Sequence, residues 1–153
     1  MKTKFLLAVI LILMSVYSFG QTISEPFKKA NTILIETKLP DSDCFTKWGK
    51  HLAQNGYSID KSDNNFLTMT TGPKNTSKFN YDFIVISSVN DSGTVIIKIK
   101  WRLNSSIIAG TSETNFYDWE YASGKNNVQN IIYEDLMKTI NSFGSYDIKF
   151  EKN

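Results

Sequence analysis

The chain has few of the residues that cross-link a fold or hold a metal. Cys44 is the only cysteine, so no disulfide bond can form within the chain. His51 is the only histidine, and no cysteine or carboxylate accompanies it at the spacing that zinc sites use. Neither a Gly-x-Ser-x-Gly motif nor a Cys–His pairing signature is present. The sequence therefore predicts no metal, no cofactor and no enzyme, and we expect the hydrophobic core to hold the fold.

An excess of charge of one sign is also lacking. Lysine and arginine number 17 and aspartate and glutamate number 15, and Lys2 and Lys4 at the N-terminus account for the difference. The rest of the chain is electrically balanced, and it has no basic stripe that could neutralise phosphates. We therefore expect neither nucleic-acid binding nor attraction to a lipid surface through lysines.

One long apolar run is present, and it lies at the N-terminus. Residues 1–4 include two lysines, residues 5–16 are apolar apart from one serine, and small residues stand at positions 18 and 20. A charged start, an apolar stretch and small residues before the cut are typical of a secretory signal peptide. The pattern predicts a signal peptide over residues 1–20, with cleavage before Gln21.

The predicted signal peptide sets the expected location. Residues 5–20 are fewer than the ~20 apolar residues that a comfortable membrane span needs, which favours cleavage over an uncleaved anchor. A bacterial lipoprotein would carry its cysteine directly after the signal, whereas Cys44 lies far downstream. We expect a periplasmic or secreted protein that is not a lipoprotein and has no stable membrane anchor after cleavage.

After the signal, residues 21–30 are predicted to form a lead-in and residues 31–153 a single α+β domain. Apolar residues at helical spacing predict one helix over residues 43–55, with Asp41, Ser42 and Asp43 as candidate N-cap side chains. A second apolar stripe predicts a helix that follows a loop and N-cap at residues 124–127 and ends at Phe143 and Gly144. The predicted strands cover residues 32–37, 57–61, 66–71, 81–89, 94–103 and 116–121, and residues 146–151 are predicted to form a short last strand or an ordered tail.

The strongest pattern in the chain is a long hairpin. Apolar residues alternate along both of its strands, at Tyr81, Phe83, Val85 and Val89 and then at Val95, Ile97, Ile99, Trp101 and Leu103. The polar residues 90–93 connect the strands, and Thr94, Lys98, Lys100 and Arg102 occupy the opposite face of the second strand. One face of the hairpin is therefore predicted to face the core and the other to face water.

These elements predict an α+β fold. Strands joined by tight turns pair antiparallel, and two one-sided helices need a common surface to cover. We predict a single antiparallel β-sheet of about five to seven strands with two α-helices packed on one face. The predicted order is β-α-β-β-β-β-β-α-(β).

The same order carries a resemblance. A strand, a helix ending in Asn55-Gly56-Tyr57-Ser58-Ile59, a hairpin into Leu67-Thr68-Met69-Thr70-Thr71, a long hairpin and a closing helix follow one another. From about Asn31 to Phe143, this arrangement resembles uncharacterised small exported or lipoprotein domains of Gram-negative bacteria. The resemblance implies a sheet-and-two-helix sandwich akin to the TATA-binding-protein-like or helix-grip arrangement. It implies no functional residue, and the lipid-attachment cysteine of many such domains is absent here.

Several polar residues are candidates for chemistry, and each has a simpler interpretation. Cys44 lies in the first turn of a predicted helix, where amide dipoles lower a thiol pKa, but an inert small residue is favoured. His51 is favoured as a solvent-facing or partly packed side chain. Two carboxylate pairs are also present, Asp60 with Asp63 and Asp118 with Glu120. Neither pair belongs to a recognisable loop motif, which favours solvated charge.

The late aromatic residues are the candidate binding site. Tyr117, Trp119 and Tyr121 alternate on one face of a predicted strand, and Trp101 is a candidate neighbour. Aromatic rings on a strand can stack on sugars, hold a peptide or line a pocket. The alternative is that these rings are the contribution of the sheet to the core.

The leading hypothesis is a non-catalytic exported module that binds a protein or peptide partner in the cell envelope. The first alternative is a carrier that holds a small apolar ligand between the sheet and the closing helix. Its cavity would be lined by Val85, Ile97, Ile132 and Leu136. The least favoured alternative is a hydrolytic enzyme with His51 or a carboxylate pair at the base of a cleft.

Overall fold

The computed structural model describes residues 24–104 and 115–153 of the chain. The predicted signal peptide, residues 1–20, lies outside the described residues. In the part that is described, the elements run in the order β1 (Thr32–Glu36), α2 (Asp41–Gln54), β2 (Ile59–Asp63), β3 (Thr68–Thr71), β4 (Lys74–Asn75), β5 (Tyr81–Val89), β6 (Thr94–Leu103), β7 (Tyr117–Asp118), α3 (Val128–Phe143) and β8 (Asp147–Glu151).

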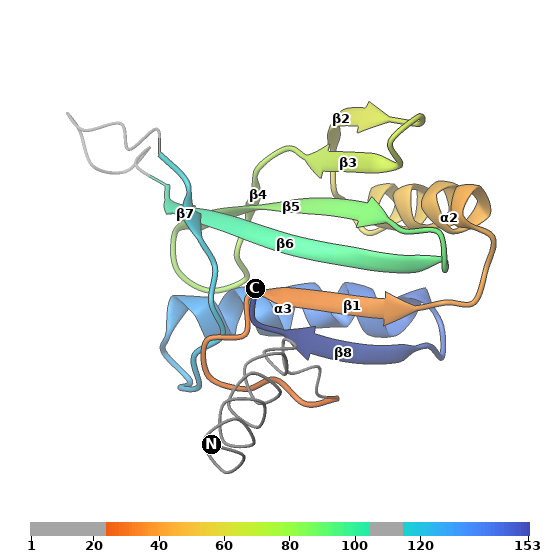
Figure 1. The fold of residues 1–153 in the computed structure, drawn as a ribbon. Coiled ribbons are helices and arrows are strands. Elements are labelled where there is room, and N and C mark those ends of the chain that lie inside the picture. The colour runs from red at the N-terminus through yellow and green to blue at the C-terminus, as the bar shows by residue number, and fades with distance from the viewer. Residues whose placement is uncertain (1–23, 105–114) are drawn as a thin grey trace, which may run out of the picture.

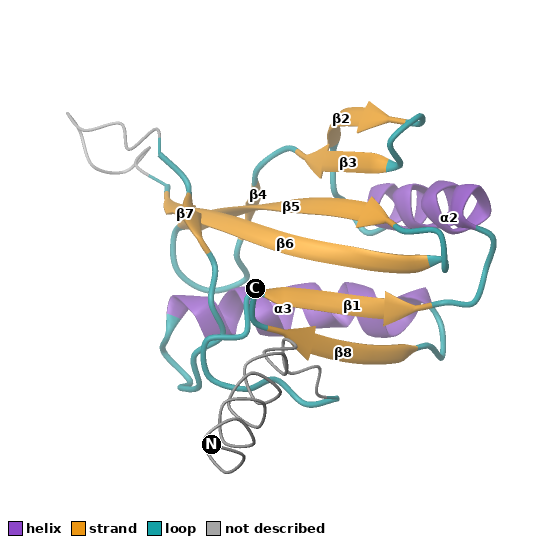
Figure 2. Ribbon diagram, in the orientation of Figure 1, coloured by secondary structure: helices purple, strands orange, loops and turns teal. Residues whose placement is uncertain are grey.

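The described strands form one antiparallel sheet, and both helices lie behind it in one layer (Figure 1; Figure 2). The main strand order is β2-β3-β5-β6-β1-β8, with the two-residue strands β4 and β7 attached to β5 and β6. The predicted α+β architecture, with one sheet and two helices on one face, is confirmed. β4 is the one described strand that was not predicted, because Gly72 and Pro73 beside it are typical of a strand break.

The predicted long hairpin is β5 with β6. The two strands pair without a shift from Tyr81 opposite Leu103 to Val89 opposite Val95. On the helix side, Phe83, Val85, Ile97 and Ile99 are buried, as the alternation predicts.

The core lies between the sheet and the two helices. Its fully buried side chains come from both layers: Ile33, Ile35, Phe83, Val85 and Ile97 from the sheet and Trp48, Leu52, Ile132, Leu136 and Ile140 from the helices. The buried Trp48 donates its indole Nε1–H to Ser87 Oγ at 3.0 Å, so this polar group keeps a partner inside the core. Burial of one such side chain typically stabilises a fold by ~1.5–3 kcal/mol.

The two helices begin in different ways. Asn127 is the N-cap of α3, and its side-chain oxygen accepts the Gln129 amide at 3.0 Å, which confirms the predicted cap. The predicted side-chain cap of α2 is wrong. The Pro40 carbonyl accepts the Cys44 amide at 2.8 Å, so the helix already begins at Asp41 and this residue lies inside the first turn. Its carboxylate still stabilises the helix N-terminus, because a negative charge interacts favourably with the amide dipoles there.

Three strand boundaries differ from the prediction for identifiable reasons. β2 starts two residues late, because the Tyr57 amide bonds back to the Leu52 carbonyl at the end of α2 (3.1 Å). β3 also starts late, because Leu67 adopts φ 48° in the preceding turn. β7 is much shorter than predicted, because the Tyr121 amide donates to the Ala30 carbonyl at 2.7 Å and draws the chain away from β6.

Candidate functional site

The four predicted binding residues fall into two groups. Trp101 and Tyr117 lie opposite each other on β6 and β7, with their ring centroids 5.6 Å apart. Tyr81 on β5 meets the other side of Trp101, also at 5.6 Å. We call these three residues the aromatic corner. Tyr117 is its exposed member, with 49% of its surface accessible.

Trp119 and Tyr121 lie elsewhere. Trp119 is 1% exposed, and its indole N–H donates to the Gln129 carbonyl at 2.8 Å. Tyr121 is half-buried between Trp119 and Tyr133, with ring centroids 6.3 and 5.0 Å away. Trp119 therefore contributes to the core, as the alternative interpretation of the aromatic pattern proposed, and of the four predicted residues Tyr117 is the exposed one.

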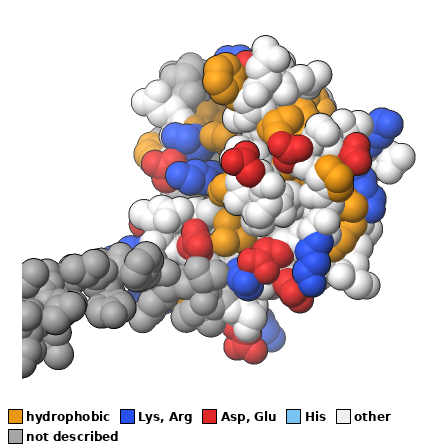
Figure 3. Space-filling model, turned by 45° about the vertical axis from the view of Figure 1, so that its right-hand side comes forward, with side chains coloured by type: hydrophobic (Ala, Val, Ile, Leu, Met, Phe, Trp, Pro, Cys, Tyr) orange, Lys and Arg blue, Asp and Glu red, His pale blue; other side chains and the backbone are white. Residues whose placement is uncertain are grey.

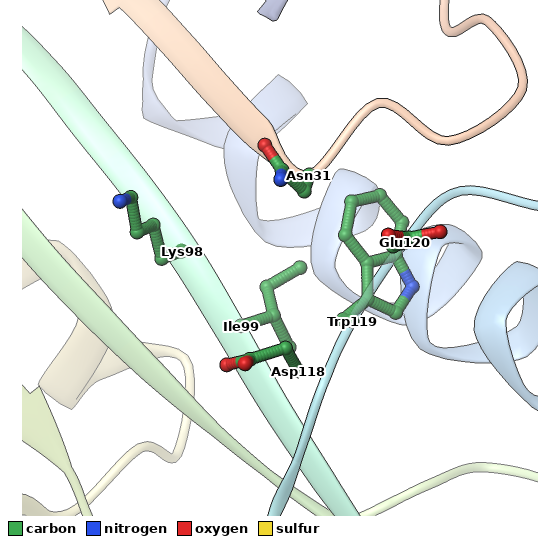
Figure 4. Close-up of a pocket in the computed structure, with 6 residues that line it drawn as sticks. All are labelled: Asn31, Lys98, Ile99, Asp118, Trp119 and Glu120. Atoms are coloured by element: carbon green, nitrogen blue, oxygen red, sulfur yellow. The ribbon is translucent and has the colours of Figure 1, made fainter. Parts of the chain in front are cut away.

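β1 and β7 pair with the same edge of β6, and a polar hollow lies between them (Figure 4). β1 pairs with β6 as far as Ile97, and β7 pairs with it at Lys100 and Trp101. The hollow between them has a volume of about 250 Å³. It is lined by Asn31, Lys98, Ile99, Asp118, Trp119 and Glu120.

The charged groups of this hollow differ in their partners. Lys100 pairs with Asp118 at 3.0 Å, with both side chains well exposed. Asn31 Nδ2 donates to the Asn153 carbonyl at 2.9 Å. The side chains of Lys98 and Glu120 have neither a hydrogen bond nor an ion pair with any residue that the structure describes. The carboxylates at positions 118 and 120, predicted as solvated charge, are both exposed and both line the hollow.

The face of the sheet away from the helices carries an apolar strip. Leu34 of β1 lies opposite Ile96 of β6, and both are half-buried. Ion pairs surround this strip: Lys149 with Glu36 at 2.6 Å, Lys100 with Asp118 at 3.0 Å and Arg102 with Asp82 at 3.4 Å. Figure 3 shows acidic and basic side chains beside one another on the face that it draws, with hydrophobic side chains between them. The Lys100–Asp118 pair is exposed, and a pair of this kind contributes ~0–1 kcal/mol. The Arg102–Asp82 pair is partly buried, since the Asp82 side chain is only 10% exposed.

The single cysteine and histidine have structural surroundings. Burial raises the pKa of the Cys44 thiol, which lies 3.4 Å from the Gly93 carbonyl oxygen. His51 Nε2 lies 2.8 Å from the Thr139 carbonyl oxygen. Because a carbonyl can only accept, Nε2 carries a proton and donates, and this bond ties α2 to α3.

Sequence reasoning missed a contact that a lysine makes with the end of α2. Lys74 Nζ donates to the Asn55 carbonyl at 2.7 Å and lies 3.7 Å above the centre of the Tyr57 ring. Burial lowers the pKa of Lys74 and raises the pKa of Tyr57. An ammonium group beside the terminal carbonyls stabilises a helix C-terminus. Lys74 therefore links β4 to the end of α2. No local signal predicts this contact, because the two partners lie 19 residues apart in the chain.

Asp135 of α3 forms a second ionic contact that the sequence did not indicate. Burial would raise the pKa of its carboxyl group, but two donors outweigh this effect and the pKa is lowered. The Ser77 amide donates to one carboxylate oxygen at 2.6 Å, and Lys138 Nζ donates to the other at 2.9 Å. The contact fastens the loop after β4 to the closing helix.

The residues proposed to line an apolar cavity belong to the core. Val85, Ile97, Ile132 and Leu136 are each fully buried within one contiguous cluster. Four hollows in the described part of the molecule are lined by other residues.

Residues 24–104 and 115–153 contain neither a membrane-crossing helix nor a convergent set of metal ligands. No helix there is both long and apolar enough to cross a membrane. No three side chains among histidine, cysteine, aspartate and glutamate converge there as metal ligands.

The described chain is thus a two-layer α+β sandwich with an exposed aromatic corner and a polar hollow at one strand junction. In comparisons with known proteins, no protein-family model matches the chain and no curated protein gives a significant match.

Proposed function

We propose that the chain is an exported, non-catalytic binding module that recognises a protein or peptide partner in the cell envelope. The signal-peptide pattern at residues 1–20 supports export. The resemblance to small exported domains of Gram-negative bacteria agrees with the same location.

The aromatic corner is the observation that carries this proposal. Tyr117 exposes about half of its surface, and its ring rests on Trp101, which rests in turn on Tyr81. Tyrosine and tryptophan are enriched at the centres of protein interfaces, because they offer a large contact area at a small loss of conformational freedom.

A capture experiment with matched aromatic variants tests the proposal. The chain without residues 1–20 is immobilised and incubated with the envelope fraction of the cells that produce it. Tyr117→Ala removes the exposed ring of the corner, and Phe66→Ala removes a ring that is 76% exposed on the β2–β3 turn. We expect a partner that binds the parent chain and Phe66→Ala equally, and that binds Tyr117→Ala at least about tenfold more weakly.

Circular dichroism of all three proteins shows whether each variant is folded. If Tyr117→Ala retains every protein that the parent chain retains, the aromatic corner is not the recognition surface. If no protein is enriched by the parent chain over a blank support, the proposed function is wrong.

A further inference from the structure

We propose that the hollow between β1, β6 and β7 binds a small zwitterion, a molecule that carries both an ammonium and a carboxylate group. A free amino acid and a short peptide share this chemistry. The proposal goes beyond recognition of a protein partner and does not depend on it, since Tyr117 does not line the hollow.

The hollow is a consequence of the sheet topology. The β1 pairing with β6 runs from Glu36 opposite Thr94 to Ile33 opposite Ile97. The Asn31 amide then bonds to the Glu151 carbonyl of β8 at 2.9 Å.

On the other side of the hollow, β6 acquires a second neighbour. The Trp119 amide donates to the Ile99 carbonyl at 3.0 Å, and Asp118 of β7 lies opposite Lys100. Lys98 lies on β6 between the residues that pair with β1 and those that pair with β7. Its side chain is exposed, so a ligand can reach it.

The unpartnered charges define the ligand. The Asp118 carboxylate is matched by Lys100, and the Asn31 amide is occupied by Asn153 and Thr32. Lys98 and Glu120 are left without a described partner, and they carry opposite charges. A ligand that completes both needs one carboxylate for Lys98 and one ammonium for Glu120, and charge-assisted hydrogen bonds of this kind are the strong ones.

The size of the hollow also fits a small ligand. In Figure 4, Lys98 lies on one side of Ile99, and Glu120 lies on the other side together with Trp119. The volume of about 250 Å³ lies below the ~300–1,000 Å³ of sites for drug-sized molecules, which favours a ligand of amino-acid or dipeptide size.

Nuclear magnetic resonance titration of the ¹⁵N-labelled chain tests the proposal with four probes. L-leucine is a free zwitterionic amino acid, and alanyl-alanine is a zwitterionic dipeptide. N-acetyl-leucine lacks the ammonium charge, and leucinamide lacks the carboxylate. We expect shifts at the signals of Lys98, Trp119 and Glu120 with at least one zwitterion, and about tenfold weaker binding once either of its charges is removed. Comparison of L-leucine with alanyl-alanine distinguishes a free amino acid from a peptide as the source of the charges.

Variants then assign each charge to its partner. Lys98→Met should weaken the zwitterion about tenfold and leave the carboxylate-free leucinamide unaffected. Glu120→Gln should weaken the zwitterion likewise and leave N-acetyl-leucine unaffected. Lys125→Met, at an exposed lysine of the loop before α3, is the control that should change nothing.

All three variants are at exposed positions, so a folding defect is not expected. The proposal is overturned if neither zwitterion shifts the signals of the hollow, if the single-charge probes bind as well as the zwitterions, or if Lys98→Met binds like the parent chain. Tyr117→Ala should bind the zwitterion normally. Loss of partner capture and loss of zwitterion binding are therefore separate results.

Discussion

Replacing Trp119 by alanine separates a core role from a surface role for the late aromatic residues. The side chain is 1% exposed, its N–H bonds to the Gln129 carbonyl at 2.8 Å, and its ring meets Tyr121 edge-on. Truncation of a buried tryptophan to alanine typically lowers the free energy of unfolding by ~3–5 kcal/mol, since it removes apolar contacts and leaves a cavity. A domain of this size has ~5–15 kcal/mol in total, so the loss is a large fraction of its stability.

The assay is urea unfolding of the parent chain and three variants, followed by circular dichroism. Trp119→Ala should lower the free energy of unfolding by ~3–5 kcal/mol and, in a parallel thermal scan, lower Tm by roughly 10–20 °C. Trp119→Phe keeps a ring but removes the bond to Gln129, and it should lose ~1–3 kcal/mol. Tyr117→Ala, two residues earlier and 49% exposed, should stay within ~0.5 kcal/mol of the parent chain.

The comparison between the neighbouring positions decides the outcome. If Trp119→Ala lowers the free energy of unfolding by less than ~1 kcal/mol, or by no more than Tyr117→Ala does, the indole is not part of the core. The packing described for Trp119 is then wrong. If Tyr117→Ala loses as much as Trp119→Ala, the aromatic corner is itself a core element and does not present a free surface.

Three further predictions follow from single groups. Gly93 has φ 68° and an added Cβ would lie 2.0 Å from the Leu39 carbonyl oxygen, so Gly93→Ala should lose more than ~2 kcal/mol in urea unfolding. Gly56→Ala has a similar positive φ but open space and should lose only ~1–2 kcal/mol, and equal losses would refute the clash. The Cys44 thiol, buried and with a raised pKa, should react with a disulfide reagent only when urea unfolds the chain, and fast labelling of the folded chain would contradict this. The pKa of Asp135 is lower in the folded state than its unfolded value of ~3.9, so its stabilisation is present above that pH and is lost as the pH falls through the folded pKa. Asp135→Asn should therefore be less stable than the parent chain at pH 7 and closer to it at pH 3, and an equal difference at both pH values would refute the linkage.

Local patterns were sufficient where one side of an element is buried and the other is solvated. The β5–β6 hairpin and the stripe of α3 follow from alternation and helical spacing, and the cap at Asn127 follows from its side chain. The same patterns failed for β2, whose five residues are all exposed and therefore carry no apolar periodicity to set its ends. They failed again after β7, because Trp119 and Tyr121 share an alternation with Tyr117 but contact different parts of the fold.

The candidate site could be predicted only in part. Tyr117 and Trp101 were named from their residue type, and the structure places them in contact. Lys98 and Glu120 could not be joined from the sequence, since 21 residues separate them and the hollow arises where two other segments leave β6. The contact of Lys74 with the end of α2 could not be predicted for the same reason, because its partners lie 19 residues apart in the chain.

The amino-acid sequence alone determined the number of layers and the face of each long element, because side-chain periodicity is a local property that burial must respect. The tertiary structure alone decided that β1 lies between β6 and β8, and that β6 shares one edge between β1 and β7. A strand can pair antiparallel with many different strands at similar local energy. The strand order is therefore decided by which arrangement buries the apolar side chains of the whole core. The hollow and the exposed aromatic corner are products of that choice.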